Sequence, residues 1–270
     1  MNASQTLPSQ TPPARPADGP QVALITGASR GLGLELARAL AAEGRPLVLT
    51  ARHRDELAAA EAELANLTKV VALAGSVVDD AHRERLARAA ADLGGADLLV
   101  NNASTLTGYD LAGAALPGLA EFPLPGLLET FEVNVLGPIA LTQLLLPQLR
   151  ARAGAIVNLS SDAAVEAYPG WGGYGASKAA LDHASAVLAA EEQAVRVWAV
   201  DPGDMRTRMH QEAFPGEDIS DRPLPRTVVP AFLTLLRERP ASGRYRAADL
   251  AAARPPGTGT AAPDDDGEPR

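Results

Sequence analysis

Six short apolar runs recur along the chain, each followed by glycine, charged or other polar residues. None of them alternates polar with apolar positions, as a strand with one wet face would. Each run therefore predicts a strand that is buried on both faces, as in a parallel sheet covered by helices. The six runs are QVALIT (21–26), PLVLT (46–50), KVVAL (69–73), ADLLV (96–100), AIVNLS (155–160) and VRVWAV (195–200). A short last strand is expected at GRYRA (243–247), at one edge of the sheet.

Longer amphipathic segments separate these runs. Residues 32–43, 54–66 and 80–92 carry apolar residues at helical spacing and charged residues on the opposite face. Strands that alternate with helices predict an α/β domain, doubly wound in three layers, with helices on both faces of the sheet. Ligands of such domains bind at the carboxyl ends of the strands.

The alternation fills residues 20–250 without a linker-like interruption, which indicates one domain. Residues 1–19 are polar and rich in proline, and residues 251–270 are rich in proline, glycine and alanine and end in an acidic PDDDGEPR. Neither segment has apolar side chains to bury, so both ends are predicted to be disordered.

Composition narrows the function classes. The 270 residues include 46% apolar but only 4% aromatic residues, so the core should consist of small aliphatic side chains. A net charge of −9 argues against a nucleic-acid partner. No cysteine is present, and the histidines show no ligand spacing, so no metal site is expected. No apolar run spans a bilayer and no signal peptide is recognisable, which predicts a cytoplasmic protein without membrane contact. The histidines are His53, His82, His183 and His210.

A glycine-rich turn follows the first expected strand. In TGASRGLG (26–33), Gly27, Gly31 and Gly33 allow a sharp turn into the first helix and leave its free N–H groups open to a phosphate. The spacing Gly-x-x-x-Gly-x-Gly differs from the commonest dinucleotide fingerprint, Gly-x-Gly-x-x-Gly. The alternative is an ordinary tight turn, but its place after the first strand of an α/β alternation favours phosphate binding.

The end of the second expected strand bears on cofactor choice. TARHR (50–54) offers Ala51 and Arg52 where NAD-selective domains carry an acid for the ribose hydroxyls. Arg52, together with Arg30 of the glycine turn, suits the 2′-phosphate of NADP. The alternative is that both arginines are solvated surface residues. We therefore expect NADP rather than NAD.

Tyr174 and Lys178 stand one helical turn apart in YGASK (174–178), where a glycine-rich loop gives way to an alanine-rich helix. A phenol is a weak acid–base catalyst at neutral pH, and a nearby ammonium group lowers its pKa. The pair is thus a plausible proton donor and acceptor for a carbonyl and an alcohol. A Tyr-x-x-x-Lys spacing on its own also occurs in purely structural helices.

Six motifs together resemble, in order and spacing, the short-chain dehydrogenase/reductase family. The resemblance covers residues 20–250 and implies a Rossmann fold with a mainly parallel seven-stranded sheet and a nicotinamide cofactor. The motifs are TGASRGLG, DLLVNNAS (97–104), VNVLG (133–137), IVNLSS (156–161), YGASK and DPGDMRT (201–207).

The resemblance implies a catalytic tetrad. Asn134 matches the helix asparagine that holds a water in the proton relay, and Ser161, thirteen positions before Tyr174, matches the serine that hydrogen-bonds the substrate oxygen. Tyr174 matches the acid–base residue, and Lys178 matches the lysine that binds the nicotinamide ribose and tunes the tyrosine. Ser160 is an alternative to Ser161, although the spacing favours Ser161.

The resemblance also implies the cofactor contacts. The glycine turn should hold the pyrophosphate, residues 102–104 the adenosine ribose side, and residues after the sixth strand the nicotinamide. Ser76-Val77 replaces the usual Asp-Val beside the adenine, and Ser104 replaces the glycine of NNAG, so either could weaken cofactor binding or reshape its pocket. The expected contacts are Gly27, Ser29, Arg30, Gly31, Leu32, Gly33, Ala51, Arg52, Ser76, Val77, Asn102, Ala103, Ser104, Tyr174, Lys178, Pro202, Gly203 and Thr207.

Together, these expectations predict an NADP(H)-dependent oxidoreductase that interconverts a carbonyl and an alcohol. Two variable segments, 162–173 and 204–225, should determine which substrate binds. Apolar residues in the second favour a neutral, moderately hydrophobic carbonyl compound, whereas its Arg206 and Arg208 would favour an acidic one.

The same motifs are also compatible with other functions. The alternatives are a non-catalytic NADP-binding sensor or scaffold and a dehydration or epimerisation. A serine hydrolase lacks its Gly-x-Ser-x-Gly motif. The resemblance implies a homodimer or homotetramer, and the apolar surface of 127–151 and 174–192 agrees with it.

Overall fold

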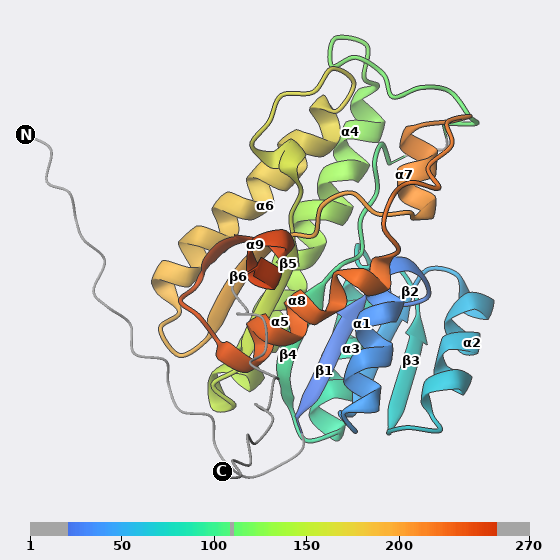
Figure 1. Ribbon diagram of the computed structural model, residues 1–270. Helices are drawn as coiled ribbons and strands as arrows, with labels where there is room; N and C mark the ends of the chain where they lie inside the picture. The colour runs from blue at the N-terminus through green and yellow to red at the C-terminus, as the bar shows by residue number, and fades with distance from the viewer. Residues whose placement is uncertain (1–20, 109–110, 253–270) are drawn as a thin grey trace, which may run out of the picture.

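Seven parallel strands form a single sheet at the centre of the protein (Figure 1). The structure is a computed structural model that describes residues 21–108 and 111–252. The strand order is β3-β2-β1-β4-β5-β6-β7. The strands are β1 (Val22–Thr26), β2 (Leu47–Ala51), β3 (Val70–Ala74), β4 (Ala96–Asn101), β5 (Ala155–Leu159), β6 (Arg196–Asp201) and β7 (Gly243–Arg246).

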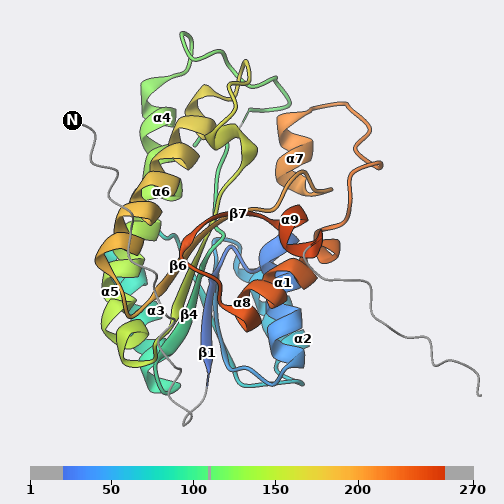
Figure 2. The same cartoon turned by 60° about the vertical axis from the view of Figure 1, so that its left-hand side comes forward.

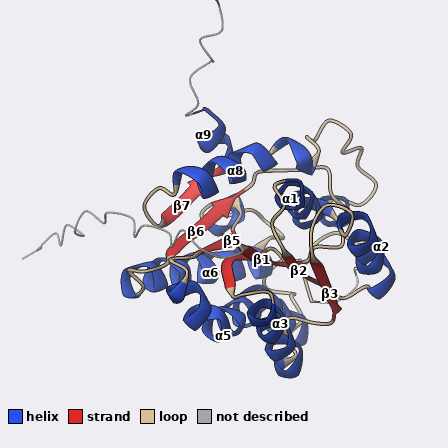
Figure 3. Cartoon of the chain, turned by 90° about the horizontal axis from the view of Figure 1, so that it is seen from below, coloured by secondary structure: helices blue, strands red, loops and turns tan. Residues whose placement is uncertain are grey.

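Helices cover both faces of this sheet (Figure 3). Helices α1, α2 and α8 lie on one face and α3, α5 and α6 on the other, so the three-layer, doubly wound α/β prediction is confirmed. The helices are α1 (Gly31–Ala42), α2 (Arg54–Leu64), α3 (Asp80–Asp92), α4 (Leu124–Phe131), α5 (Gly137–Ala151), α6 (Gly172–Glu191), α7 (Arg208–Ala213), α8 (Val229–Glu238) and α9 (Ala247–Ala252). None of the described helices is long and apolar enough to span a membrane.

Each central strand contributes to both cores, which explains the unbroken apolar runs of the sequence. In β1, Ala23 and Ile25 pack toward α1 and α8, whereas Val22 and Leu24 pack toward α3 and α5. Because successive side chains of a strand point to opposite faces, a strand between two helical layers needs apolar residues at every position.

The strand order reverses between β1 and β4. From β1 the chain winds outward through β2 and β3, and from β4 it winds the other way through β5, β6 and β7. The loops that leave the carboxyl ends of β1 and β4 therefore diverge and leave a crevice between them. This crevice is where a dinucleotide binds in a Rossmann fold.

The apolar segment 127–151 forms two α-helices rather than one. Helix α4 and helix α5 are joined by a π-helical turn, Glu132–Leu136, whose Val133, Asn134 and Val135 are buried. A π turn adds a residue to the helical ladder and re-aims the side chains that follow it. Here it directs Asn134 toward the carboxyl ends of the strands.

The expectations for the two chain ends concern mostly residues outside the described part of the chain. Residues 1–19 and 253–270 lie outside it. Helix α9 continues to Ala252, two residues beyond the expected end of the domain. Figure 2 shows β7 beside β6, with α9 after it near α8. In the strand order, β7 is the edge strand opposite β3.

Candidate active site

Two adjoining cavities lie at the carboxyl ends of the strands. The larger has a volume of about 540 Å³ and includes the glycine turn, and the smaller, of about 430 Å³, is enclosed by the 162–173 loop and the α7 segment. Tyr174 lines both cavities, so its side chain stands in the wall that they share. The residues common to both are Leu106, Ser160, Tyr174, Pro202, Met205, Thr207 and Met209.

The glycine turn forms one end of the larger cavity. Gly27 and Gly31 have positive φ angles of 65° and 58°. A Cβ atom on Gly33 would lie 2.4 Å from the carbonyl oxygen of Gly27, so no larger residue fits there. Helix α1 begins at Gly31, and no side chain caps its first turn. Its free N–H groups therefore provide the anion site that the sequence predicts.

Asn102 fixes this turn against β4. Its Nδ2 donates hydrogen bonds to the carbonyl oxygens of Thr26 at 2.9 Å and Gly27 at 3.1 Å. The Thr26 hydroxyl accepts from the backbone N–H groups of Asn102 and Ala103. The ends of β1 and β4 are thus tied together at the point where the strand order reverses.

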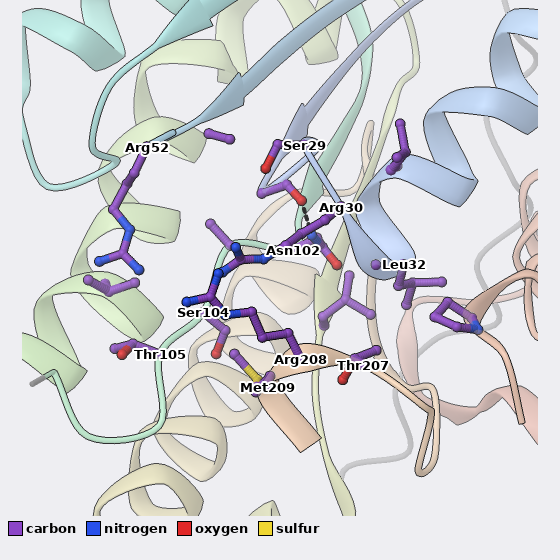
Figure 4. A pocket seen from close by; sticks show the side chains of 18 of the residues that line it. Ser29, Arg30, Leu32, Arg52, Asn102, Ser104, Thr105, Thr207, Arg208 and Met209 are labelled. Carbon is purple, nitrogen blue, oxygen red and sulfur yellow. Dashed lines mark hydrogen bonds between the residues drawn. The ribbon is translucent and has the colours of Figure 1, made fainter. Parts of the chain in front are cut away.

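Arginine side chains also line the larger cavity. Arg30 and Arg52 line it, as the sequence predicts for a 2′-phosphate site (Figure 4). Arg206 and Arg208 line this same cavity rather than the smaller one. Arg30 also forms an ion pair with Glu56 of α2 at 3.3 Å, and Glu56 accepts a hydrogen bond from Ser29.

Most of the predicted cofactor contacts line the larger cavity. Gly33 is packed beneath the turn and Gly203 lines the smaller cavity. The predicted residues that do line the larger cavity are Gly27, Ser29, Arg30, Gly31, Leu32, Ala51, Arg52, Ser76, Val77, Asn102, Ala103, Ser104, Tyr174, Lys178, Pro202 and Thr207.

Tyr174 and Lys178 project from the first two turns of α6. Both are buried, with 9% and 2% of their surface exposed. The Lys178 Nζ donates to the carbonyl oxygen of Leu159 at 2.7 Å and lies 5.4 Å from the centre of the Tyr174 ring. The end of β5 therefore fixes the ammonium group beside the phenol.

The two adjacent serines after β5 have different partners. The Ser160 hydroxyl donates to Asp182 at 2.7 Å. The Ser161 hydroxyl donates to Asp162 at 2.9 Å, and Ser161 is also near enough to the Tyr174 hydroxyl to lower its pKa. The geometry thus separates the two serines that the sequence left as alternatives, with Ser161 beside the phenol.

Arg244 of β7 holds this serine loop, a contact that the sequence did not predict. Its Nη2 donates to the Ser161 carbonyl oxygen at 2.9 Å, and its Nε donates to Asp182 at 2.9 Å. Its Nη2 also lies 3.5 Å from Asp201, at the end of β6. The only sequence signal was the short GRYRA run, which gives no indication that its first arginine faces the site.

Every polar group of the Asn134 side chain has a protein partner. Its Oδ1 accepts from the Ser104 hydroxyl at 3.0 Å and the Thr105 N–H at 2.9 Å. Its Nδ2 donates to the Thr105 carbonyl oxygen at 2.8 Å and to the Ser177 hydroxyl at 2.9 Å. The predicted water would therefore have to be held by the main-chain carbonyl, because the amide is already used.

Ser104 connects this asparagine to the phenol. Besides its bond to Asn134, the Ser104 side chain is near enough to the Tyr174 hydroxyl to lower its pKa. From the sequence, Ser104 is expected to be a cofactor contact and is a departure from the family pattern. The structure brings its hydroxyl to the centre of the site, a position that the NNAS motif alone did not indicate.

Burial has opposite consequences for the two ionisable groups. It raises the pKa of Tyr174, an effect that the interactions of the phenol with Ser161 and Ser104 partly offset. It lowers the pKa of Lys178 to about 8, against the opposing effect of the Asp182 carboxylate. From the sequence, the ammonium group is expected to lower the phenol's pKa, but in this structure desolvation of the phenolate is the largest effect on that pKa.

Comparison with known proteins identifies the family. Residues 21–218 match the family model described as short chain dehydrogenase. The chain belongs to this family. It is 34% identical to sepiapterin reductase of Mus musculus over 213 residues, which are 72% of this chain and 78% of the mouse protein.

Two solved structures share this fold. A short-chain dehydrogenase of Shigella flexneri, complexed with NADP, is 27% identical with a TM-score of 0.76, and the match covers 85% of this chain and 98% of that one. An alcohol dehydrogenase of Thermococcus sibiricus, complexed with 5-hydroxy-NADP, is 28% identical with a TM-score of 0.74, covering 84% and 95%.

The buried Lys178 predicts a pH-dependent stability. Its pKa of about 8 lies below the ordinary 10.5 of an unfolded chain, so between these values the unfolded state binds more protons. The free energy of unfolding should therefore rise with pH across this window. Below the window Lys178 is charged in both states, so the folded state carries the full cost of desolvating its ammonium group. Relative to Lys178→Met, the wild-type free energy of unfolding should increase by roughly 2 kcal/mol from about pH 7 to about pH 10. Urea unfolding without added nucleotide measures this difference, and a constant difference would contradict the assignment.

Proposed function

We propose that this protein is an NADP(H)-dependent oxidoreductase that interconverts a carbonyl group and an alcohol. The observation that carries the proposal is the place of Tyr174 in the wall between the two cavities. A phenol in this wall can exchange a proton with a substrate in the smaller cavity while a nicotinamide lies in the larger one. A non-catalytic sensor would need the larger cavity alone.

The larger cavity fits a dinucleotide. The glycine turn and the free N–H groups of α1 suit a pyrophosphate, and Arg30 and Arg52 suit a 2′-phosphate. No acid stands at the end of β2, where NAD-selective domains carry one. The NADP and 5-hydroxy-NADP complexes of the two solved relatives support this preference. When bound, the cofactor supplies or accepts the hydride.

Side chains of this protein donate the proton and stabilise the charges that its transfer leaves. In the reducing direction, the Ser161 hydroxyl donates a hydrogen bond to the carbonyl oxygen, and Tyr174 transfers its proton to the developing alkoxide. The charge of Lys178 stabilises the phenolate that this leaves. With a pKa of about 8, Lys178 remains mostly protonated at neutral pH.

Ser104 and Ser161 share the stabilisation of the phenolate. Both lie close to the Tyr174 hydroxyl, and both lower a pKa that burial raises. Asn134 fixes Ser104 from the π turn, and Arg244 fixes the backbone of Ser161. We assign Asn134 and Arg244 as positioning residues, since the groups they hold face the phenol.

Location and assembly remain predictions. The sequence predicts a cytoplasmic protein and a homodimer or homotetramer. Apolar side chains of the α4–α6 region are exposed, which supports an interface there. They are Leu124, Leu128, Leu136, Leu144 and Val187.

A panel of aldehydes, ketones and alcohols with NADPH, NADH and their oxidised forms tests the proposal. Turnover, read at the nicotinamide absorbance, should occur with NADPH or NADP. Tyr174→Phe should lower kcat by about 10²–10⁴-fold because the proton donor is lost. Its dissociation constant for NADPH should stay within a few-fold of wild type. Wild-type turnover by the variant would refute the role of Tyr174.

Arg52→Glu tests the cofactor preference by binding alone. The new carboxylate repels a 2′-phosphate and suits ribose hydroxyls, so the dissociation constant for NADPH should rise at least tenfold while that for NADH is unchanged or lower. Fluorescence titration of the reduced cofactors measures both constants. Arg54→Glu, an exposed site that does not line the cavity, is the matched control. Equal losses for both cofactors would contradict a 2′-phosphate contact.

Ser104→Ala tests the hydroxyl beside the phenol. Its loss removes a hydrogen bond that stabilises the phenolate, so the pH profile of kcat/KM for alcohol oxidation should move to higher pH by up to about one unit. Ser104→Thr keeps a hydroxyl and should retain the wild-type profile. If activity fell by the same factor at every pH, Ser104 would have only a packing role.

A further inference from the structure

The smaller cavity has an acidic lining. Asp162, Asp201 and Asp204 line it, and no lysine or arginine does so among the described residues. The arginines of the α7 segment that would suit an anionic substrate line the larger cavity instead. This distribution separates the charges of the two cavities, with cations around the expected phosphates and carboxylates around the expected substrate.

The three carboxylates differ in whether a cationic side chain lies near them. Asp201 lies 3.5 Å from Arg244, and Asp204 lies 3.7 Å from His210 and 4.0 Å from Arg222. The side chain of Asp204 is nevertheless 62% exposed.

Asp162 accepts hydrogen bonds only from uncharged donors. These are the hydroxyls of Ser161 and Tyr168 and the backbone N–H of Ala163. In the described part of the chain it forms no ion pair, so its negative charge faces the cavity without a cationic partner.

Aromatic rings form part of the remaining wall, beside aliphatic and methionine side chains. Trp171 packs edge-on against Tyr174, with ring centres 5.7 Å apart, and lies 5.9 Å from Phe214. Phe214 stacks at 4.8 Å on His210, a buried residue whose Nε2 has no hydrogen-bond partner. A cation held beside ring faces and carboxylates gains from both, as in sites that bind quaternary ammonium groups.

We propose that the smaller cavity takes a cationic substrate, an aldehyde or ketone whose hydrophobic or aromatic body carries an ammonium group. The proposal rests on the function proposed above. Asp162 and Asp204 attract the ammonium group, and the aromatic rings contact the body. The cavity's volume of about 430 Å³ suits such a compound.

The electrostatics of the two tyrosines agree with a negative cavity. Desolvation is the main cause that raises the pKa of both Tyr168 and Tyr174, and Asp162 adds to it because a carboxylate opposes a second negative charge nearby. A substrate cation in the cavity would counter this effect and favour the phenolate that forms during reduction. Substrate charge should therefore help the chemical step as well as binding.

A matched substrate pair tests this selectivity. para-(Trimethylammoniomethyl)benzaldehyde and para-neopentylbenzaldehyde have the same shape but differ by one charge, and the methylene group insulates the carbonyl from the substituent. Wild-type kcat/KM with NADPH should be about tenfold or more higher for the cation. The ratio should fall in about 0.5 M salt, because exposed charges are screened. para-(Carboxymethyl)benzaldehyde should be the poorest substrate.

Two single variants, their double variant and one control variant test which carboxylates cause the preference for the cationic aldehyde. Asp162→Asn and Asp204→Asn should each lower the cation-to-neutral ratio, and the double variant should bring it to about one. The neutral aldehyde serves as an internal standard, since Asp162 also touches Ser161. Glu166→Gln removes the same charge from the same exposed loop but does not line the cavity, so it should keep the wild-type ratio.

A binding measurement separates failure of this inference from failure of the proposed function. Calorimetric titration with benzyltrimethylammonium needs no hydride transfer, and its affinity should fall in the double aspartate variant. Turnover of the neutral and cationic aldehydes at equal efficiency would overturn the cationic preference and leave the oxidoreductase. Aspartate-dependent binding without any turnover would support the cation site and count against the oxidoreductase. Aspartate-independent binding, or none, would overturn the inference.

Discussion

A phenol buried in the wall between two cavities is the feature on which the rest of the site depends. Burial makes the phenolate of Tyr174 costly, since a charged group loses its water when it enters the protein. Ser161 and Ser104 reduce this cost through their interactions with the phenol, and the ammonium group of Lys178 lies 5.4 Å from the ring centre. In the proposed reaction, the same burial would keep the proton on the phenol until a negative charge develops beside it.

The fold supplies this arrangement through its parallel strands. Because all seven strands run in one direction, the loops after β1, β4, β5 and β6 meet at one edge of the sheet. The β1 loop provides the glycine turn, the β4 loop Ser104, and the β5 loop Ser161. Arg244 of β7 and the π turn before α5 then fix two of these loops by hydrogen bonds. Positioning groups from distant parts of the chain thus converge on one side chain.

Much of this arrangement was predictable from the sequence because it depends on local patterns. Apolar runs without alternation predicted the strands to within about a residue at each end, since a strand between two helical layers must be apolar throughout. The glycine turn and YGASK were recognisable because backbone geometry and helical spacing require those residues at those positions. Ser104, Arg244 and the π turn were not, since each acts through a contact between segments far apart in sequence. The direction of the pKa shift of Tyr174 could not be predicted from the sequence either, because the cost of burying the phenolate depends on how deeply the fold buries this side chain.

The central claim is that Tyr174 passes a proton at the boundary between the two cavities. A crystal structure with NADP and an unreactive alcohol analogue tests it most directly. The account predicts a nicotinamide ring at that boundary, with the alcohol oxygen about 3 Å from both the Tyr174 and the Ser161 hydroxyls. A phenol turned away from the ring, or an alcohol bound beyond reach of Tyr174, would contradict it.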